Sequence, residues 1–286
     1  MLKTVELTKR NRENGCVMLL GGFDGLHVGH LRLVECAKKY RLPIGIMTIE
    51  GAKENGNLFT FAERERIFSR HGIDFVFELP FERIRELSPE AFLQTLTEKF
   101  SPTVFVCGDD FRFGKGAVAS AETIKSATRV RVEVEKLVTI DGEKVSARRI
   151  KELLEKGDVF AAARLLGEPY FLTGIVQKDR GVGRTLGFPT ANIEYPQGKL
   201  PIKKGVYQTQ IAVDGKTYKG ITNYGARPTF GNSRVVTETH INGFSGDLYG
   251  RELTVSFTRY LRDIVAFESV EELKNQLRED IGRIRQ

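Results

Sequence analysis

Several features that assign a chain to a special class are scarce or missing in these 286 residues. The three cysteines are far apart and form no C-x-x-C pair, so the sequence offers no disulfide framework. No apolar run approaches the roughly 18 residues that a membrane span requires. The polar start MLKTVELTKRNRENG also lacks the apolar core of a secretory signal. We therefore expect a cytoplasmic protein that does not bind membranes, with Cys16 and Cys107 as buried thiols in strand-like runs.

A concentrated basic surface is also missing, although the chain carries 44 Lys and Arg against 37 Asp and Glu. A basic excess can indicate a nucleic-acid partner, but here the two signs are interleaved, as in FAERERIFSR. A mild excess suits small polyphosphate ligands equally well. We therefore expect small anionic partners and no nucleic acid, while the oligomeric state stays unknown.

The first half of the chain alternates strand patterns with helix patterns. Apolar runs predict strands at residues 16–20, 44–49, 74–79 and 103–107, and helix patterns lie between them. Thr60 with Glu63 forms a capping box, and Ser88 before Pro89 is typical of a helix start. Helical patterns from 147 to 166, broken at Gly157, close this half. Such alternation predicts an α/β domain with a parallel sheet covered on both faces, whose ligands bind at the carboxyl ends of the strands.

The second half has a different texture after Pro169. Short stretches rich in Thr, Val, Ile and Tyr, such as GVYQTQIAV, are separated by glycine turns, and VDGK is typical of a hairpin. These features predict an all-β barrel or sandwich. One terminal helix follows, capped by Ser269 and Glu272, with an apolar stripe of Val270, Leu273, Leu277, Ile281 and Ile284. We expect two domains, residues 1–167 and 168–286.

The stretch GGFDGLHVGH, residues 21–30, combines a strand end, a glycine turn and a helix start. Backbone N–H groups and the helix dipole make such a junction an anion site, and glycine lets a phosphate approach the backbone. His27 and His30 are three residues apart and share a face of the helix, so both could donate hydrogen bonds to phosphate. Two alternatives are a pair of ordinary histidines and a zinc pair, although no further ligands follow at a suitable spacing.

GFDGLHVGH resembles the nucleotidyltransferase signature of the bacterial bifunctional riboflavin kinase/FMN adenylyltransferase (FAD synthetase) family. CGDDFRFGKG at residues 107–116 and VSARRIKELLEKGDV at residues 145–159 are similar to the second and third blocks of that family. The resemblance covers nearly the whole chain in the same order. It implies a Rossmann-like nucleotidyltransferase domain in which the phosphate of FMN attacks the α-phosphate of ATP.

This resemblance also implies roles for individual residues. His27 and His30 would hold the triphosphate of ATP, and Ser146 and Arg149 would bind its β- and γ-phosphates. Asp110 would contact the flavin nucleotide or a metal. The remaining residues implied for ATP binding are Gly22, Phe23, Asp24 and Gly29.

Two departures from the family pattern concern this first domain. The third block of the family commonly reads I-S-S-T-x-I-R, whereas residues 145–151 read VSARRIK, so a hydroxyl pair is missing. The proline-rich stretch of the family after the second strand is replaced by TIEGAKENGN.

A second candidate site lies in GVGRTLGFPTANI, residues 181–193. Thr190 and Asn192 alternate along an extended chain and therefore face the same side. A hydroxyl and an amide oxygen there can bind Mg²⁺, which prefers oxygen ligands. The alternative is a plain barrel turn in which both side chains bond to their own backbone.

The same segment looks like the flavokinase signature of the family, and KGITNYGARPTFG and TETHINGFSGDLYG resemble its later blocks. The resemblance implies a riboflavin kinase that transfers the γ-phosphate of ATP to the ribityl 5′-hydroxyl. Glu238 would be the general base, and Thr190 and Asn192 would bind Mg²⁺-ATP. The other residues implied are Gly181, Gly183 and Arg184 around the phosphates, and Asn223, Arg227 and Arg262 on the flavin side.

Three functional hypotheses follow from these patterns. In the main one the chain is both a riboflavin kinase and an FMN adenylyltransferase. In the second only the kinase is active, because the third block of the first domain is altered. The third is a flavin- or nucleotide-binding regulator without turnover, and the presence of Glu238 argues against it because a mere binder needs no general base.

Overall fold

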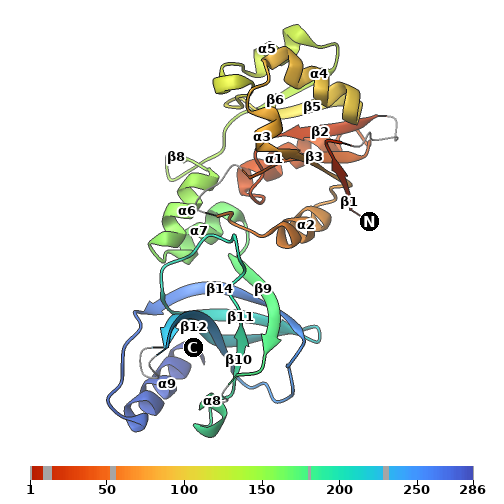
Figure 1. The fold of residues 1–286 in the computed structure, drawn as a ribbon. Coiled ribbons are helices and arrows are strands. Elements are labelled where there is room, and N and C mark those ends of the chain that lie inside the picture. The colour runs from red at the N-terminus through yellow and green to blue at the C-terminus, as the bar shows by residue number, and fades with distance from the viewer. Residues whose placement is uncertain (1, 9–14, 52–55, 180–181, 228–231, 286) are drawn as a thin grey trace. The chain divides into compact units, whose positions relative to one another are not determined.

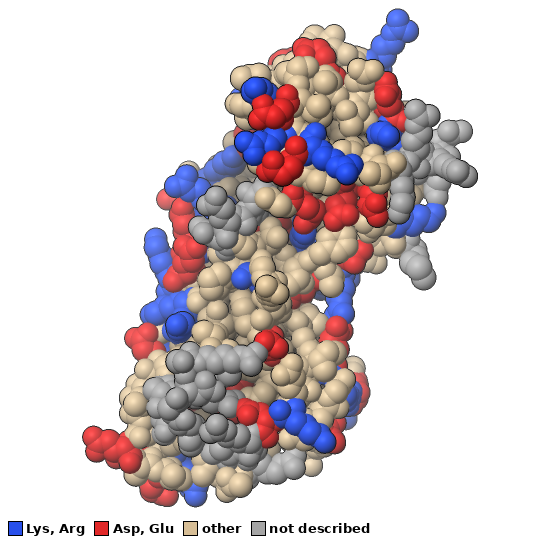
Figure 2. Space-filling view, viewed as in Figure 1, with Lys and Arg blue, Asp and Glu red and all other residues tan. Residues whose placement is uncertain are grey.

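The computed structural model describes residues 2–8, 15–51, 56–179, 182–227 and 232–285. The chain divides into two compact units, Met1–Ala147 and Arg148–Gln286 (Figure 1). Within the described residues no helix has both the length and the apolar character needed to cross a membrane. On the face drawn in Figure 2 the acidic and basic side chains lie interspersed, as their interleaving in the sequence predicts.

In its described part, the first unit forms a parallel sheet of six strands in the order β1-β4-β3-β2-β5-β6. The strands are β1 (Lys3–Glu6), β2 (Cys16–Leu20), β3 (Ile44–Glu50), β4 (Phe75–Pro80), β5 (Pro102–Gly108) and β6 (Arg131–Glu135). The helices are α1 (Val28–Lys38), α2 (Phe61–Arg70), α3 (Phe81–Ile84), α4 (Pro89–Phe100) and α5 (Ala121–Ala127), with a short 3₁₀ turn η1 (Lys115–Ala117). A hairpin of β7 (Thr139–Ile140) and β8 (Glu143–Lys144) follows β6.

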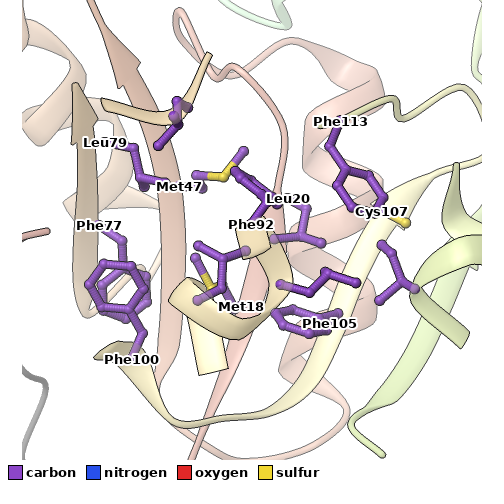
Figure 3. Close-up of a cluster of buried hydrophobic side chains, with 14 of the residues drawn as sticks. Met18, Leu20, Met47, Phe77, Leu79, Phe92, Phe100, Phe105, Cys107 and Phe113 are labelled. Atoms are coloured by element: carbon purple, nitrogen blue, oxygen red, sulfur yellow. The ribbon is translucent and has the colours of Figure 1, made fainter. Parts of the chain in front are cut away.

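Both faces of this sheet are buried, as the sequence predicts for a parallel sheet. Met18 and Leu20 point to one face, where they pack in a cluster with Phe100 at the end of α4 (Figure 3). Val17 and Leu19 alternate with them toward the opposite face, and both are fully buried there. Apolar burial on two faces explains why β2 reads as a continuous apolar run.

Local signals in the sequence are confirmed where helices begin. Thr60 and Glu63 form the predicted capping box of α2, and the Ser88 hydroxyl accepts the N–H of Ala91 at the start of α4. The sequence-based prediction did not include β1 and β6, the strands at the two edges of the sheet. Both are short and contain charged residues, at the two ends of KTVE and at every second position of RVEVE, so neither shows an apolar run.

The three thiols are buried and free, as expected for Cys16 and Cys107. Burial raises the pKa of the Cys16 thiol to about 12 and that of Cys107 to about 11. Thiols with such pKa values are protonated and poorly nucleophilic at neutral pH.

The second unit contains a closed antiparallel barrel in the order β10-β13-β12-β11-β14-β9, which decides between barrel and sandwich. The predicted hairpin joins β11 to β12 at Asp214 and Gly215, both with positive φ, as a tight hairpin turn requires. The interior contains a hydrogen-bonded row of buried threonines, Thr209, Thr222 and Thr239. The strands are β9 (Phe171–Gln177), β10 (Thr190–Ile193), β11 (Gly205–Val213), β12 (Lys216–Arg227), β13 (Asn232–Ile241) and β14 (Glu252–Arg262).

Helices α6 (Ala147–Glu155) and α7 (Val159–Leu166) precede the barrel, and the predicted break between them occurs at Gly157, which has positive φ. Helix α7 contacts β14, so residues 148–166 group in space with the barrel. The predicted boundary between an adenylyltransferase domain and a kinase domain, at residues 167 and 168, stays a prediction.

Helix α9 (Val270–Arg285) closes the chain and packs against β12. Ile281 and Ile284 of the predicted stripe are buried against Ile221. Val270 is 54% exposed, so the stripe prediction is wrong at the first residue of the helix, where the chain has not yet reached the barrel surface. The short helix α8 (Val182–Thr185) lies before β10.

Candidate active sites

The first candidate site is built on the N-terminus of α1. After β2 ends at Leu20, the chain turns, and His27 caps the helix by accepting the N–H of His30 on its Nδ1 atom at 3.1 Å. The helix therefore begins at Val28. Its first turn contains no acidic residue, so the positive end of the helix dipole is available to an anion.

The hydrogen bonds of the two histidines determine which ring nitrogens carry protons. Because Nδ1 of His27 accepts a hydrogen bond, the proton of the neutral ring is on Nε2. Burial lowers the pKa of His27 to about 4, and the nearby Lys144 also lowers it. His27 is therefore a neutral Nε2–H donor at pH 7.

His30 is bonded in the opposite sense. Its Nδ1 lies 3.0 Å from the carbonyl oxygen of Gly25, which can only accept, so Nδ1 carries a proton. The Nε2 atom of His30 can then donate to a phosphate only when the ring is cationic. The two rings stack at 3.6 Å between centroids with 15° between their planes. The pair thus offers one neutral donor and one donor that depends on protonation.

The turn between β2 and α1 needs glycine for space. A Cβ atom on Gly25, whose φ is +143°, would lie 2.7 Å from the ring of Phe59. A Cβ atom on Gly29 would lie 3.1 Å from the ring of His27. By contrast, no described atom lies within 4 Å of a Cβ position on the exposed Gly22, so a phosphate can approach its backbone.

Phe23 and Asp24 are buried within this turn. The ring of Phe23 lies 4.5 Å from that of His30, and the Asp24 carboxylate accepts the N–H of Leu58 at 3.0 Å. Both side chains support the shape of the turn, and their contact with ATP stays a prediction.

A second segment reaches this site after β5. The Asp110 carboxylate forms an ion pair with Lys144 of β8, and both charges influence the pKa of His27. The structure therefore brings together His27, His30 and Asp110, as the resemblance implies. It adds Lys144, which the sequence patterns did not single out because it lies just before the third block.

The third block begins at the junction of the two units. Ser146 is half-buried immediately before α6, and Arg149 is half-buried on α6 within the second unit. In the pattern I-S-S-T-x-I-R, the arginine position falls on Lys151. Lys151 is two positions from Arg149 on α6, so the two side chains lie on different sides of the helix and are alternative candidates for phosphate binding.

The second candidate site is a row of side chains across the barrel. Asn192 of β10 pairs in register with Glu238 of β13, and Glu238 pairs with Asn223 of β12. Residues paired in register point to the same side of a sheet. These three are half-buried, whereas their neighbours Thr222 and Thr239 are buried inside the barrel. The row therefore lies on the outer face.

Thr190 joins this row through its side chain, because its hydroxyl donates to the Glu238 carboxylate at 2.7 Å. His240, its partner in register, donates from Nδ1 to the carbonyl of Pro189 at 2.9 Å. A Cβ atom on Gly183 would lie only 2.4 Å from the carbonyl oxygen of Phe188 and 3.1 Å from the Thr190 hydroxyl. Gly183 on α8 thus packs directly against Thr190.

Arg262 lies at the far end of the same row. It pairs in register with Val206, which pairs with Asn223, so it is three strands from Glu238, or about 14 Å at the usual strand spacing. Its guanidinium binds the fully buried carboxylate of Asp280 on α9. Arg262 therefore anchors α9 beside the row, and its contact with a flavin stays a prediction.

Three predicted residues cannot be placed in the same way. Gly181 lies outside the described residues, and the side chains of Arg184 and Arg227 do as well.

The oxygen atoms of the row fit a hard cation. A hydroxyl, an amide and a carboxylate lie together on Thr190, Asn192 and Glu238, and Mg²⁺ is bound by such groups together with substrate phosphates. Within the described ranges, no group of three or more His, Cys, Asp or Glu residues is arranged to hold a metal.

Comparison with known proteins places both sites in one family. A family model described as FAD synthetase matches residues 9–149, and one described as riboflavin kinase matches residues 166–286. A bifunctional riboflavin kinase/FMN adenylyltransferase of Pseudomonas fluorescens is 33% identical, over 96% of this chain and 94% of that protein. The chain belongs to this bifunctional family.

Other relatives are similar over their whole length. The enzyme of the same description from Escherichia coli K12 is 32% identical over 94% of this chain and 91% of that protein. A crystal structure of a macrolide-efflux protein from Streptococcus pneumoniae has a TM-score of 0.89 at 28% identity, over 99% of both chains. The two-part fold is therefore shared with a solved structure. The likeness also covers the segment around Lys144 and the strands that carry the row.

Proposed function

We propose that this chain phosphorylates riboflavin to FMN in the barrel unit and adenylylates FMN to FAD in the parallel-sheet unit, with ATP as co-substrate of both reactions. The observation that carries the proposal is the convergence of Thr190, Asn192 and Glu238 on one patch of the barrel. Free buried cysteines and an ATP co-substrate suit a cytoplasmic enzyme.

In the kinase reaction, the Glu238 carboxylate takes the proton of the ribityl 5′-hydroxyl as that oxygen attacks the γ-phosphate. The bond from the γ-phosphorus to the bridging oxygen breaks, and ADP leaves. Thr190 and Asn192 would hold Mg²⁺, which when bound neutralises charge on the phosphates of ATP. The hydrogen bond from Thr190 keeps the Glu238 carboxylate in place beside the row. Gly183 packs against the Thr190 hydroxyl and would bring the backbone of α8 close to the same phosphates.

In the adenylyl transfer, a phosphate oxygen of FMN attacks the α-phosphate of ATP and pyrophosphate leaves. The reaction requires no nucleophile from the protein, so positioning and charge stabilisation supply the catalysis. His27 donates from its neutral Nε2–H, and the N-terminus of α1 faces the growing negative charge. Ser146 and Arg149 bind the β- and γ-phosphates of ATP.

The test is incubation of the full chain with riboflavin, ATP and Mg²⁺, with the products followed by chromatography. We expect FMN to form first and FAD to follow. FMN alone, even when excess FMN is supplied as substrate, would mean that the altered third block has inactivated adenylyl transfer. The absence of both products would overturn the proposal.

A further inference from the structure

Lys144 enters the first site on the β7–β8 hairpin. The base of this hairpin is closed by the N–H of Val145, which bonds to the carbonyl of Val138 at 2.9 Å. The Cβ atom of Val138 lies 3.9 Å from the Cβ position of Gly29, in the first turn of α1. The hairpin therefore packs beside the helix N-terminus, although the two segments are far apart in the sequence.

The ammonium group of Lys144 is bound to the Asp110 carboxylate, and both side chains are almost half exposed. Exposed ion pairs contribute only about 0–1 kcal/mol, so exchange of this partner costs little. A phosphate offers the ammonium group more negative charge and a stronger charge-assisted hydrogen bond than a carboxylate does. The influence of Lys144 on the titration of His27 also places the ammonium group near the histidine pair.

We propose that Lys144 is a phosphate-binding residue of adenylyl transfer. When substrates bind, its ammonium group moves away from the Asp110 carboxylate and contacts the reacting phosphates. This inference rests on the proposed FMN adenylyltransferase activity. A bond forms between an FMN phosphate oxygen and the α-phosphorus, and the bond from that phosphorus to the bridging oxygen breaks. The electron pair leaves with pyrophosphate, and Lys144 stays protonated throughout. Its charge therefore stabilises the transition state more than the ground state, which lowers the barrier.

Asp110 has a separate task in this arrangement. It holds the ammonium group at the site before substrates arrive, so that the long lysine side chain loses less rotamer freedom on binding. Asp110 is thus a positioning residue for Lys144, in addition to any contact with the flavin nucleotide.

The decisive variant is Lys144→Ala in the full chain. We expect kcat/KM for FAD formation to fall on the order of 10²-fold, as for the loss of one donor to a developing anion, with Lys144→Arg retaining part of the activity. The matched control is Lys38→Ala, because Lys38 is equally exposed and also pairs with a carboxylate, in the last turn of α1, at the opposite end of that helix from the site. It should change FAD formation by no more than about twofold. Unchanged FAD formation in Lys144→Ala would overturn the proposal.

Two further measurements distinguish failure of the Lys144 proposal from failure of the proposed FMN adenylyltransferase activity. Riboflavin phosphorylation by the same Lys144→Ala preparation should equal that of the wild type, because the barrel unit does not contain Lys144. Titration calorimetry with pyrophosphate in EDTA should show weaker binding to Lys144→Ala than to the wild type. If the wild type makes no FAD, the proposed adenylyltransferase activity is wrong, and only the titration then tests whether Lys144 binds phosphate. Equal pyrophosphate affinities of the wild type and Lys144→Ala would show that it does not.

Discussion

The two candidate sites present opposite chemistry to the triphosphate that each is proposed to bind. The first presents hydrogen-bond donors, namely a helix N-terminus, the neutral Nε2–H of His27 and, when its ring is cationic, His30, and it lies beside the Lys144 ammonium group. The second presents oxygen groups that can accept, because the Asn192 amide and the Glu238 carboxylate are paired in register on the barrel. Donors can meet a phosphate directly, whereas acceptors repel it unless a cation lies between them.

This difference follows from the elements that carry each site. A helix N-terminus exposes unsatisfied N–H groups, so a site built there begins with donors. In a closed barrel the backbone groups of the strands pair with neighbouring strands, so a site on the strands is formed mainly by side chains. The four experiments that follow test whether the two sites are independent and whether their chemistry differs as described.

The largest effect is expected for Glu238→Gln. Loss of a general base costs about 10²–10⁴ in rate, and glutamine keeps the size of the side chain and can still accept from Thr190. FMN formation should fall by this factor while conversion of FMN to FAD stays unchanged, as measured by chromatography with each flavin as substrate. An equal loss of both activities would contradict two separate sites.

His30→Ala should have the reverse pattern. Removal of one donor to a developing anion costs about 10²–10³ in rate, so FAD formation from FMN should fall while riboflavin phosphorylation is retained. His71→Ala is the control, because His71 lies at the C-terminal end of α2. Full FAD synthesis by His30→Ala would refute the interpretation that the glycine turn and His30 bind the phosphates of ATP.

Withdrawal of divalent metal should weaken ATP binding at the barrel site much more than at the helix site. In the variant His27→Ala/His30→Ala the barrel is the intact site, and EDTA should weaken binding of a non-hydrolysable ATP analogue by about 100-fold, since a divalent cation contributes several kcal/mol. In Thr190→Ala/Asn192→Ala the helix site is intact, and EDTA should weaken binding far less. If calorimetry finds that EDTA lowers the affinity for the analogue equally in both variants, the barrel site does not depend on a cation more than the helix site does.

The smallest effect concerns stability. The pKa of His27 is about 4 in the folded unit against about 6.5 when unfolded. The unfolded chain therefore binds more protons between these values, and stability falls as pH drops from 6.5 toward 4. His27→Asn removes the titration while keeping a side chain that can cap α1.

The wild type should lose about 2 kcal/mol more than His27→Asn between pH 7.5 and pH 5, an upper figure for a well-buried group. Hydrogen exchange in β2 and β5, compared between the two proteins at each pH, measures this difference. His71→Asn should follow the wild type. Parallel pH profiles for the wild type and His27→Asn would mean that His27 is not held neutral by burial.

Much of the fold could be predicted because its determinants are local. The capping box of Thr60 and Glu63 and the hairpin at Asp214 each depend on a few consecutive residues. The edge strands β1 and β6 were missed because pairing with a neighbour, and no apolar pattern of their own, makes them strands. The resemblance supplied the candidate site residues, but it could not supply their contacts.

By itself the sequence determined that a glycine turn leads into a helix near His27 and His30, and that Thr190 and Asn192 share a face, because turn residues and alternation within a few residues decide both. Only the tertiary structure decided that Glu238 lies between Asn192 and Asn223, that Lys144 meets Asp110, and that His27 is neutral. Strand register and burial depend on pairing and packing between distant segments, and no short stretch of sequence contains that information.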